Sequence, residues 1–348
     1  MTRNRKQSSS SYAYPGLASI PGLHSFAMEL DPGSRLSSSS SSAAKSHQQS
    51  HPSASIRPQI WLISDAFSAL GRELAHEVLS KGHLVALGCR SEAVAQVTAT
   101  FVPVYSEDRV LVCKLDPRNK PLCQSALAEI LAKWTRLDVV IVCPAKTVVA
   151  TIEEASEWHL RDQLEASYYG PVNLITTVLP VLRQQKSGHI LAVTGIVGQM
   201  GTPSLGLVSA AVHALEGYTE ALAFEIAPFN IKLTIVEPSL EIALATPVFF
   251  TKAMDHYKNS VSAKVRSMLA CKDLSPDLLV KDVVTAIINV AGIENPPARL
   301  VAGAEAIEQI RDKLRTVSEE IEDMLEVSYA ADSAALTEEQ RRELRGVD

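Results

Sequence analysis

Short runs of apolar residues alternate with segments of helical spacing along most of this chain. The first run, Ile60–Ile63, predicts a buried strand. The segment 70–80 has an apolar residue at every fourth position and ends before Gly82, which predicts a helix. The alternation continues with strands predicted at 83–90, 109–115, 137–143, 189–195 and 232–238 and helices at 123–133, 157–183 and 208–227. Continuous apolar strands separated by helices predict an α/β fold with a doubly wound parallel sheet of the Rossmann type.

The same patterns divide the chain into three regions. Residues 1–56 are serine-rich and polar and cannot bury enough apolar surface to offset their ordering entropy, so we predict a disordered segment. Residues 57–332 form the predicted Rossmann-type domain with a small C-terminal lobe, and residues 333–348 form a charged tail. Near the end of the domain an apolar seam at helical spacing predicts core or dimer packing: Ile307, Ile310, Leu314, Val317, Ile321 and Met324.

Composition indicates which kinds of partner and which cellular compartment suit this chain. Of 348 residues, 46% are apolar and 21% charged, enough to bury a sizeable core. The net charge of −6 and the lack of a basic run argue against nucleic acid as a partner. No apolar run reaches the roughly 18 residues of a membrane span. Five scattered cysteines favour reduced thiols in the cytoplasm over disulfides or a metal site, and the acid-free first 28 residues leave an organelle transit peptide as a less favoured alternative.

The loop after the first strand, SDAFSALG (64–71), tests whether this fold holds a dinucleotide. Such loops use glycines to approach a pyrophosphate, but here only Gly71 is a glycine, and Asp65 places a carboxylate where the anion would lie. Two like charges ~4 Å apart repel by about 4 kcal/mol at an effective dielectric near 20, and by ~1 kcal/mol across water. These residues favour an ordinary strand–turn–helix corner. The candidate cofactor contacts are Ser64, Ser68, Leu70 and Gly71, with Arg90 near an adenosine 2′-phosphate and Asp116 near the adenine side.

One long segment carries a family resemblance. ALEGYTEALAFEIAPFNIKLTIVEPS (214–239) follows LDVVIVCPA, GPVNLITTVLPVL and GHILAVTGIVGQMGTP in order, and from Ile60 to about Asp332 the chain resembles the short-chain dehydrogenase/reductase family. The resemblance implies NAD or NADP as cofactor and hydride transfer between the nicotinamide and a carbonyl or alcohol. It also implies an Asn-Ser-Tyr-Lys tetrad, in which the lysine lowers the pKa of the tyrosine that acts as general acid and base.

The tetrad is absent at the positions that the resemblance assigns. Ser167 stands at the asparagine position, Gly195 at the serine, Val208 at the tyrosine and Val212 at the lysine. The two valines lie one helical turn apart and present methyl groups where a phenol and an ammonium would converge. Removing a positioned acid/base costs about 10²–10⁴-fold in rate. We therefore predict a catalytically impaired member, a pseudoenzyme with no catalytic residue and weak or lost NADP or NAD binding, that acts as a binding, scaffold or regulatory module.

Two alternatives stay open. The first is an active NADP-dependent oxidoreductase of a small hydrophobic carbonyl or alcohol that uses non-standard residues, with Tyr168 or Tyr169 and Lys146 as a replacement set. The second is a subunit that forms a homo- or hetero-oligomer through the long helices 157–183 and 208–227. The apolar stretch after Pro238, which covers the substrate in the family, suits a hydrophobic small molecule, a partner peptide or a closed lid over an empty cleft.

Overall fold

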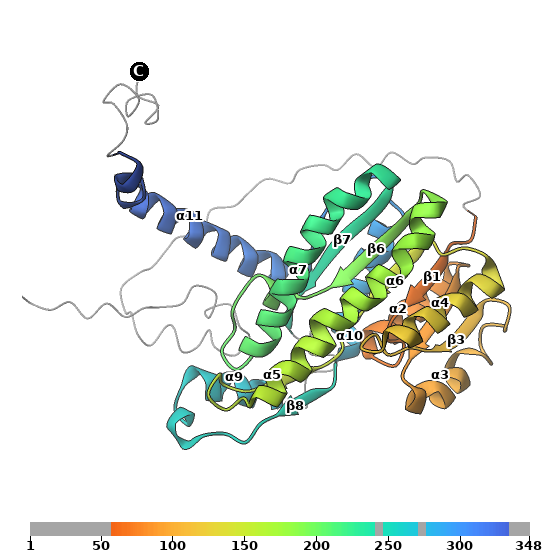
Figure 1. Ribbon diagram of the computed structural model, residues 1–348. Coiled ribbons are helices and arrows are strands. Elements are labelled where there is room, and N and C mark those ends of the chain that lie inside the picture. The colour runs from red at the N-terminus through yellow and green to blue at the C-terminus, as the bar shows by residue number, and fades with distance from the viewer. Residues whose placement is uncertain (1–56, 241–245, 271–275, 334–348) are drawn as a thin grey trace, which may run out of the picture. The chain divides into compact units, whose positions relative to one another are not determined.

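The computed structural model describes residues 57–240, 246–270 and 276–333 (Figure 1). The predicted disordered segment 1–56 and nearly all of the predicted tail lie outside the described residues. The described residues up to Ile307 form one compact unit, and those from Glu308 onward belong to a second. Within the described part, no helix combines the length and apolar content that a bilayer span requires.

The predicted doubly wound parallel sheet is confirmed. Seven parallel strands run in the order β3-β2-β1-β4-β6-β7-β9. The order reverses beside β1, where a crevice forms at the carboxyl ends of the strands and where such folds bind ligands. The strands are β1 (Ile60–Ile63), β2 (Leu84–Cys89), β3 (Val110–Lys114), β4 (Val139–Val142), β6 (Gly188–Val193), β7 (Ile231–Pro238) and β9 (Arg299–Ala302).

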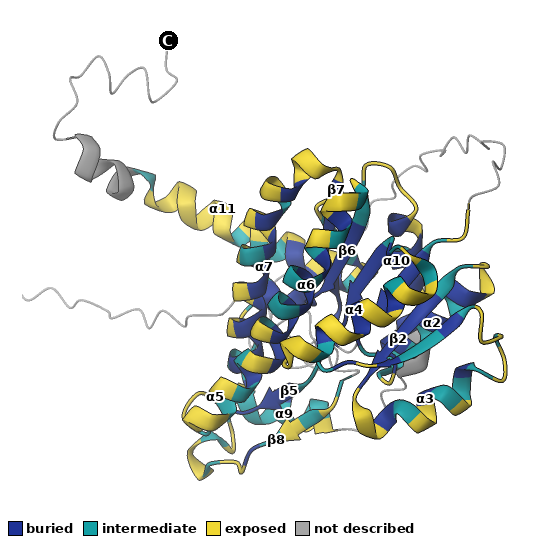
Figure 2. Cartoon of the chain, turned by 45° about the vertical axis from the view of Figure 1, so that its right-hand side comes forward, coloured by how far each residue is buried: buried dark blue, intermediate teal, exposed yellow. Residues whose placement is uncertain are grey.

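Helices cover both faces of this sheet, and each face has its own apolar core (Figure 2). Successive side chains of a strand point to opposite faces. Trp61 and Ile63 of β1 therefore pack with one set of helices, while Ile60 and Leu62 pack with the other. The first set is α2 (Ala69–Ser80), α3 (Val94–Phe101) and α10 (Pro276–Ala291), and the second is α4 (Lys120–Trp134), α6 (Gly170–Gln185) and α7 (Gly206–Ile226).

The helix predicted over 157–183 is interrupted. It consists of α5 (Glu157–Leu164), the π-helical turn η3 (Glu165–Tyr169) and α6, which continues to Gln185. Ser156 caps α5 through the amide of His159, and the His159 ring accepts from the Ser156 amide. A π-turn inserts an extra residue into the helix and is frequent at functional sites. In this chain the π-turn contains Ser167. No periodic pattern in the sequence could have predicted a π-turn at this place.

Several short elements were not predicted by the sequence pattern. The strands β5 (Thr147–Val149) and β8 (Val248–Phe250) pair only with each other among the described strands. Three residues are too few to show a period. The segment after β8 contains the helix α9 (Val261–Ala270).

The apolar seam at the end of the domain lies on α11 (Ala304–Ser333). Leu314, Val317, Ile321 and Met324 are exposed. Ile307 is also exposed, at 36%, and among the six only Ile310 is buried. The core alternative of the prediction is therefore wrong for these five side chains, and dimer packing stays a prediction.

Candidate functional site

The loop after β1 is held by its own polar groups. The Ser64 hydroxyl accepts a 2.8 Å hydrogen bond from the amide of Cys143, which ties the loops after β1 and β4 together. One oxygen of Asp65 accepts from the amides of Phe67 at 3.1 Å and Ser68 at 3.3 Å. Backbone amides in this position are the donors that hold a phosphate in dinucleotide-binding folds. The carboxylate of Asp65 therefore occupies two of the donors that the anion would use.

The start of α2 explains why one glycine is retained. The Ser68 hydroxyl donates to the Asp65 carbonyl at 2.8 Å and accepts from the Gly71 amide at 3.1 Å, so Ser68 is the N-cap of α2. A Cβ on Gly71 would lie 1.9 Å from the Asp65 carbonyl oxygen, so only glycine fits there. The side chain of Leu70 is buried in the core. The geometry assigns these three residues to building the turn.

A cleft of about 110 Å³ opens at the switch point of the sheet. The predicted cofactor residues Ser64, Arg90 and Asp116 line this cleft, together with Asp65, whereas Ser68, Leu70 and Gly71 do not. Phe67 of the same loop is 43% exposed and is not part of the lining. The remaining charged side chains of the cleft are Arg118 and Lys146, which the sequence did not identify as cofactor contacts.

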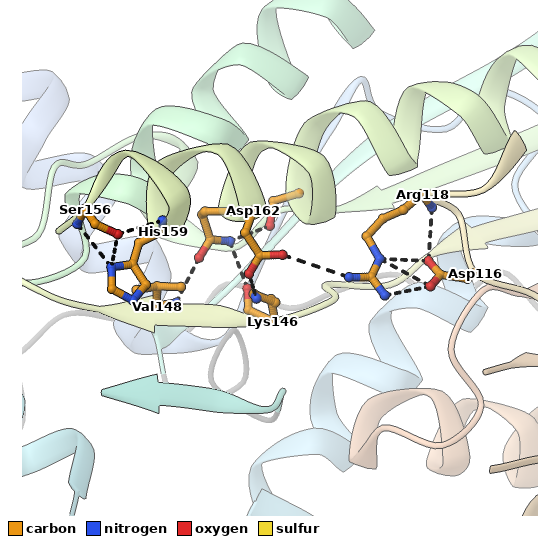
Figure 3. Close-up of polar contacts among 9 residues, drawn as sticks. Asp116, Arg118, Lys146, Val148, Ser156, His159 and Asp162 are labelled. Carbon is orange, nitrogen blue, oxygen red and sulfur yellow. Dashed lines mark hydrogen bonds and ion pairs between the residues drawn. The ribbon is translucent and has the colours of Figure 1, made fainter. Parts of the chain in front are cut away.

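An ionic chain runs along this cleft (Figure 3). Arg118 binds Asp116 with a 2.6 Å contact between Nη2 and Oδ2, and its Nη1 lies 4.0 Å from Asp162 on α5. Asp162 in turn is ion-paired with Lys146, which precedes β5. Hydrogen bonds from Arg118 hold the pKa of Asp116 below its usual range, and burial, with the charges of Arg118 and Arg90, lowers the pKa of Lys146. An incoming phosphate would have to compete with carboxylates already bound to these cations.

Asp65 itself has a raised pKa, because burial outweighs the two amide bonds and the charge of Arg90. The charged form is thus less favourable in the folded protein than in the unfolded chain. Binding of a proton to Asp65 therefore stabilises the folded wild type. This stabilisation is complete below the unfolded-state pKa of Asp65 and is lost as the pH rises through its folded-state pKa.

We expect Asp65→Asn to be more stable than the wild type at pH 7, because asparagine keeps an oxygen for the two amides and carries no charge. The difference should shrink as the pH falls toward the ordinary aspartate pKa of about 4. Urea unfolding of both proteins from pH 4 to pH 8 measures it. A variant that is less stable at pH 7 would contradict this electrostatic account of the loop.

The positions assigned to the tetrad surround a much smaller space. Ser167, Val208 and Val212 line a cavity of about 20 Å³, which is room for about one water. Val208 and Val212 are 7% and 6% exposed, and both line this cavity from α7. Gly195 follows β6 with φ of 79°, a conformation that favours glycine over serine. Restoring a serine there would therefore strain the backbone as well as change the chemistry.

Ser167 is held in a buried amide network. The side-chain amide of Gln163 donates to the Ser167 hydroxyl at 2.8 Å and to the Lys146 carbonyl at 2.9 Å. Its oxygen accepts from the amide of Val148 at 2.8 Å, and Gln163 is fully buried. This network joins α5 and η3 to β5. Sequence reasoning missed Gln163, although a glutamine on the buried face of a helix is a signal for a buried polar contact.

The structure does not assemble the replacement set. Tyr168 and Tyr169 pack against each other, with ring centroids 5.0 Å apart, and neither lines the small cavity. Lys146 lines it, but its ammonium is paired with Asp162 and lies 5.7 Å from the ring of Trp158. No phenol therefore meets an ammonium among the residues that line this cavity.

The lobe over the cleft is fastened by a buried carboxylate. Glu154 accepts from the amides of Met254 at 2.8 Å and Thr151 at 3.0 Å, and from Arg266 of α9 at 2.8 Å. Burial raises the pKa of Glu154, but the amides and Arg266 outweigh it and the net pKa is lowered. Pro247 of the same lobe lines the larger cleft. These contacts fasten the lobe to the loop that follows β5.

A second charged cluster adjoins the small cavity through Thr194, which lines the cavity. Glu216 of α7 accepts from the Thr194 hydroxyl at 2.7 Å and from Arg299 at 2.7 Å. Arg299 also pairs with Glu237 of β7, which accepts a 2.9 Å bond from Gln199. Burial, and then the charge of Glu216, raises the pKa of Glu237. Sequence reasoning missed this cluster, although the signal is present as a glutamate inside the apolar strand TIVEP.

Comparisons with known proteins agree with the fold described above. Residues 59–247 match the short chain dehydrogenase family. "Oxidoreductase BOA17" of Botryotinia fuckeliana is 29% identical over 279 residues, 78% of this chain and 99% of that protein. The "3-ketodihydrosphingosine reductase" of Bacteroides thetaiotaomicron is 34% identical over 185 residues, 53% of this chain and 64% of that protein.

Two solved structures share the fold. A short-chain dehydrogenase from Streptomyces avermitilis has a TM-score of 0.70 at 26% identity, covering 78% of this chain and 98% of its own. The structure "ElxO with NADP Bound" has a TM-score of 0.57 at 19% identity, covering 72% and 99%, and at that identity it supports the fold alone.

Proposed function

Because this chain belongs to the short-chain dehydrogenase family, we propose that it is a member without turnover that acts as a binding, scaffold or regulatory module. One observation carries this proposal. Val208 and Val212 present methyl groups to a cavity of about 20 Å³ at the positions where the family places its proton-transfer groups. A side chain with no titratable proton cannot act as a general acid or base.

The cofactor cleft supports the same proposal. Asp65 competes with a pyrophosphate for the loop amides, and Arg118 and Lys146 are already bound to carboxylates. Arg90, which the sequence associates with an NADP 2′-phosphate, lies 3.5 Å from Glu92. Binding of NADP or NAD would have to displace these contacts, so we expect it to be weak.

The exposed aromatic side chains of the long helices favour a protein partner. Phe224 on α7 is 84% exposed and Tyr169 on η3 is 50% exposed. Exposed aromatic residues are enriched in interfaces between proteins. A homo- or hetero-oligomer through α6 and α7 would cover them.

An active NADP-dependent oxidoreductase is the second candidate function. Relatives that match this chain are named oxidoreductases and a 3-ketodihydrosphingosine reductase, whose name indicates a long-chain carbonyl substrate. Arg90 and Lys146 line the cleft and supply positive charge for a phosphate. In this function Lys146 would be the remaining cation beside the reacting carbonyl.

The cysteines support the cytoplasmic location proposed from the sequence. Four of them are described, and all four are free and buried: Cys89, Cys113, Cys123 and Cys143. Burial raises their thiol pKa, to about 11 for Cys89 and Cys123. Such thiols are unreactive at neutral pH, which suits a reducing compartment.

Purified protein should turn over less than ~10⁻² s⁻¹ with NADPH or NADH and a panel of ketones, aldehydes and alcohols, against typical enzyme values of about 1–10³ s⁻¹. Absorbance at the nicotinamide band measures it. The panel should include long-chain 3-keto compounds. The matched control is the Lys146→Met variant, because an activity that comes from a trace contaminant would be the same in both preparations. Turnover of the native protein above this limit that Lys146→Met abolishes would establish the second candidate function instead.

A further inference from the structure

Lys146 lies where the two cavities of the candidate site meet. Its side chain lines both the larger cleft of about 110 Å³ and the small cavity of about 20 Å³. Among the described residues that line these two spaces, it is the only lysine. The side chain is 25% exposed, and its ammonium is paired with Asp162 of α5 (Figure 3). A partly buried amine is therefore accessible to a ligand that enters the larger cleft.

The surroundings of Lys146 favour the uncharged form of its amine. Burial, and then the charges of Arg118 and Arg90, lower the pKa of Lys146. Lysines that form imines with carbonyl compounds are activated in these two ways, by desolvation and by neighbouring cations. The anionic charge of Asp162 opposes this shift, but its carboxylate is also a proton acceptor in contact with the ammonium. An amine beside a proton acceptor is the arrangement that imine formation requires.

The charges around the larger cleft favour an uncharged ligand. Three cations and three carboxylates meet here: Arg90, Arg118, Lys146, Asp65, Asp116 and Asp162. Their formal charges cancel, so the cleft offers no net attraction to an anion. Much of the remaining lining is apolar and includes Leu115, Ala166 and Pro247. The ligand that fits this lining is a small neutral compound, and the chemistry that reacts with an amine is a carbonyl group.

We propose that Lys146 binds small neutral aldehydes or ketones covalently, as a reversible imine. This inference rests on the proposed function of a binding module and names the class of ligand that the module holds.

The step balances without a cofactor. Asp162 takes one proton from the ammonium, the free amine forms a bond to the carbonyl carbon, and the carbonyl oxygen takes up a second nitrogen proton to become a hydroxyl. Asp162 then returns its proton to this hydroxyl, which leaves as water while the carbon–nitrogen double bond forms. The products are a protonated imine, whose positive charge stays beside Asp162, and one water, and nothing is oxidised or reduced. The small cavity, which Lys146 also lines, has room for about one water.

The test incubates the full chain with butanal and sodium cyanoborohydride, which reduces a protonated imine to a stable secondary amine. Mass spectrometry of peptides then measures the modification of each lysine. Lys81 is the internal reference, because it is paired with Glu77 at 3.3 Å but is 47% exposed and lies outside the cleft. Lys146 should be modified about tenfold faster than Lys81, since its amine is desolvated and has cationic neighbours. Without the reductant, dialysis should remove the modification from Lys146.

Matched variants and a matched probe isolate the amine and the ligand class. Lys146→Arg keeps a cation for Asp162 but cannot form an imine, so total modification should fall to the level of the exposed lysines. Lys81→Arg should leave the modification of Lys146 unchanged. The probe 4-oxobutanoate has the same four carbons as butanal and adds a carboxylate. It should modify Lys146 about tenfold more slowly than butanal, because the cations of the cleft already face carboxylates and a further buried charge is unfavourable.

Equal modification of Lys146 and Lys81 overturns the proposal, as does equal modification of Lys146 by the two probes. An adduct at Lys146 that survives dialysis without the reductant also overturns it, because an imine is hydrolysed. No nicotinamide takes part in the step, so these outcomes leave the proposed absence of turnover intact. Turnover with NADPH would instead overturn the proposed function, whether or not Lys146 forms an imine.

Discussion

Replacing Arg299 with methionine is expected to lower the free energy of unfolding by about 3–5 kcal/mol, because it leaves buried carboxylates without their cation. The carboxylates of Glu216 and Glu237 are 5% and 0% exposed, and Arg299 contacts both. One oxygen of Glu237 is buried and has no hydrogen-bond partner. Methionine fills a similar volume but supplies neither charge nor donors, so both carboxylates would stay desolvated. Urea unfolding at pH 7 measures the loss.

The matched control is Arg161→Met. Arg161 pairs with Glu157 at 2.7 Å, but both side chains are about three-quarters exposed, 75% and 76%. Such a pair is worth about 0–1 kcal/mol, so the control should unfold almost as the wild type does. The loss in Arg299→Met should also shrink toward pH 5, because burial already raises the pKa of Glu237, so its unpaired carboxylate takes up a proton in the folded state. A loss below about 1 kcal/mol, or one equal to that of the control, would refute the assignment of Arg299 as the cation of a buried cluster.

Replacing Asp65 with glycine is expected to increase the affinity for NADPH. The substitution removes a charge beside the phosphate position and frees the amides of Phe67 and Ser68. The charge effect alone corresponds to about 1–4 kcal/mol, or about 5-fold to 1,000-fold in the dissociation constant. Calorimetry on the native and variant proteins measures it.

Two further variants separate the causes of this gain. Asp65→Asn removes the charge but keeps an acceptor for the amides, so it should recover the electrostatic part only. Glu77→Gln removes the same charge from an exposed surface pair with Lys81 and should leave affinity unchanged. If neither Asp65 variant binds NADPH more tightly than the native protein, then Asp65 is not what excludes the coenzyme from the loop.

The order of elements and the candidate positions were within reach of the sequence. Apolar runs and helical spacing identified six of the seven strands of the sheet and the helices α2, α4, α6 and α7, because burial on one or both faces requires those periods locally. The glycine requirement at Gly71 and the valines at Val208 and Val212 could also be read directly. What the pattern did not reveal were the short strands β5 and β9, the helices α3 and α10, and the π-turn at Ser167.

The sequence by itself determined the doubly wound sheet and the apolar character of Val208 and Val212. Only the tertiary structure decided where the charged side chains go. Arg299 lies 83 residues from Glu216 and 62 from Glu237, yet one guanidinium binds both. Periodicity records how each segment is buried, whereas side chains from distant segments meet only when packing brings their elements together, and no local pattern encodes that. The carboxylate of Asp65 illustrates the same limit, because its residue type could be read in the sequence but its hydrogen bonds to the loop amides required the fold.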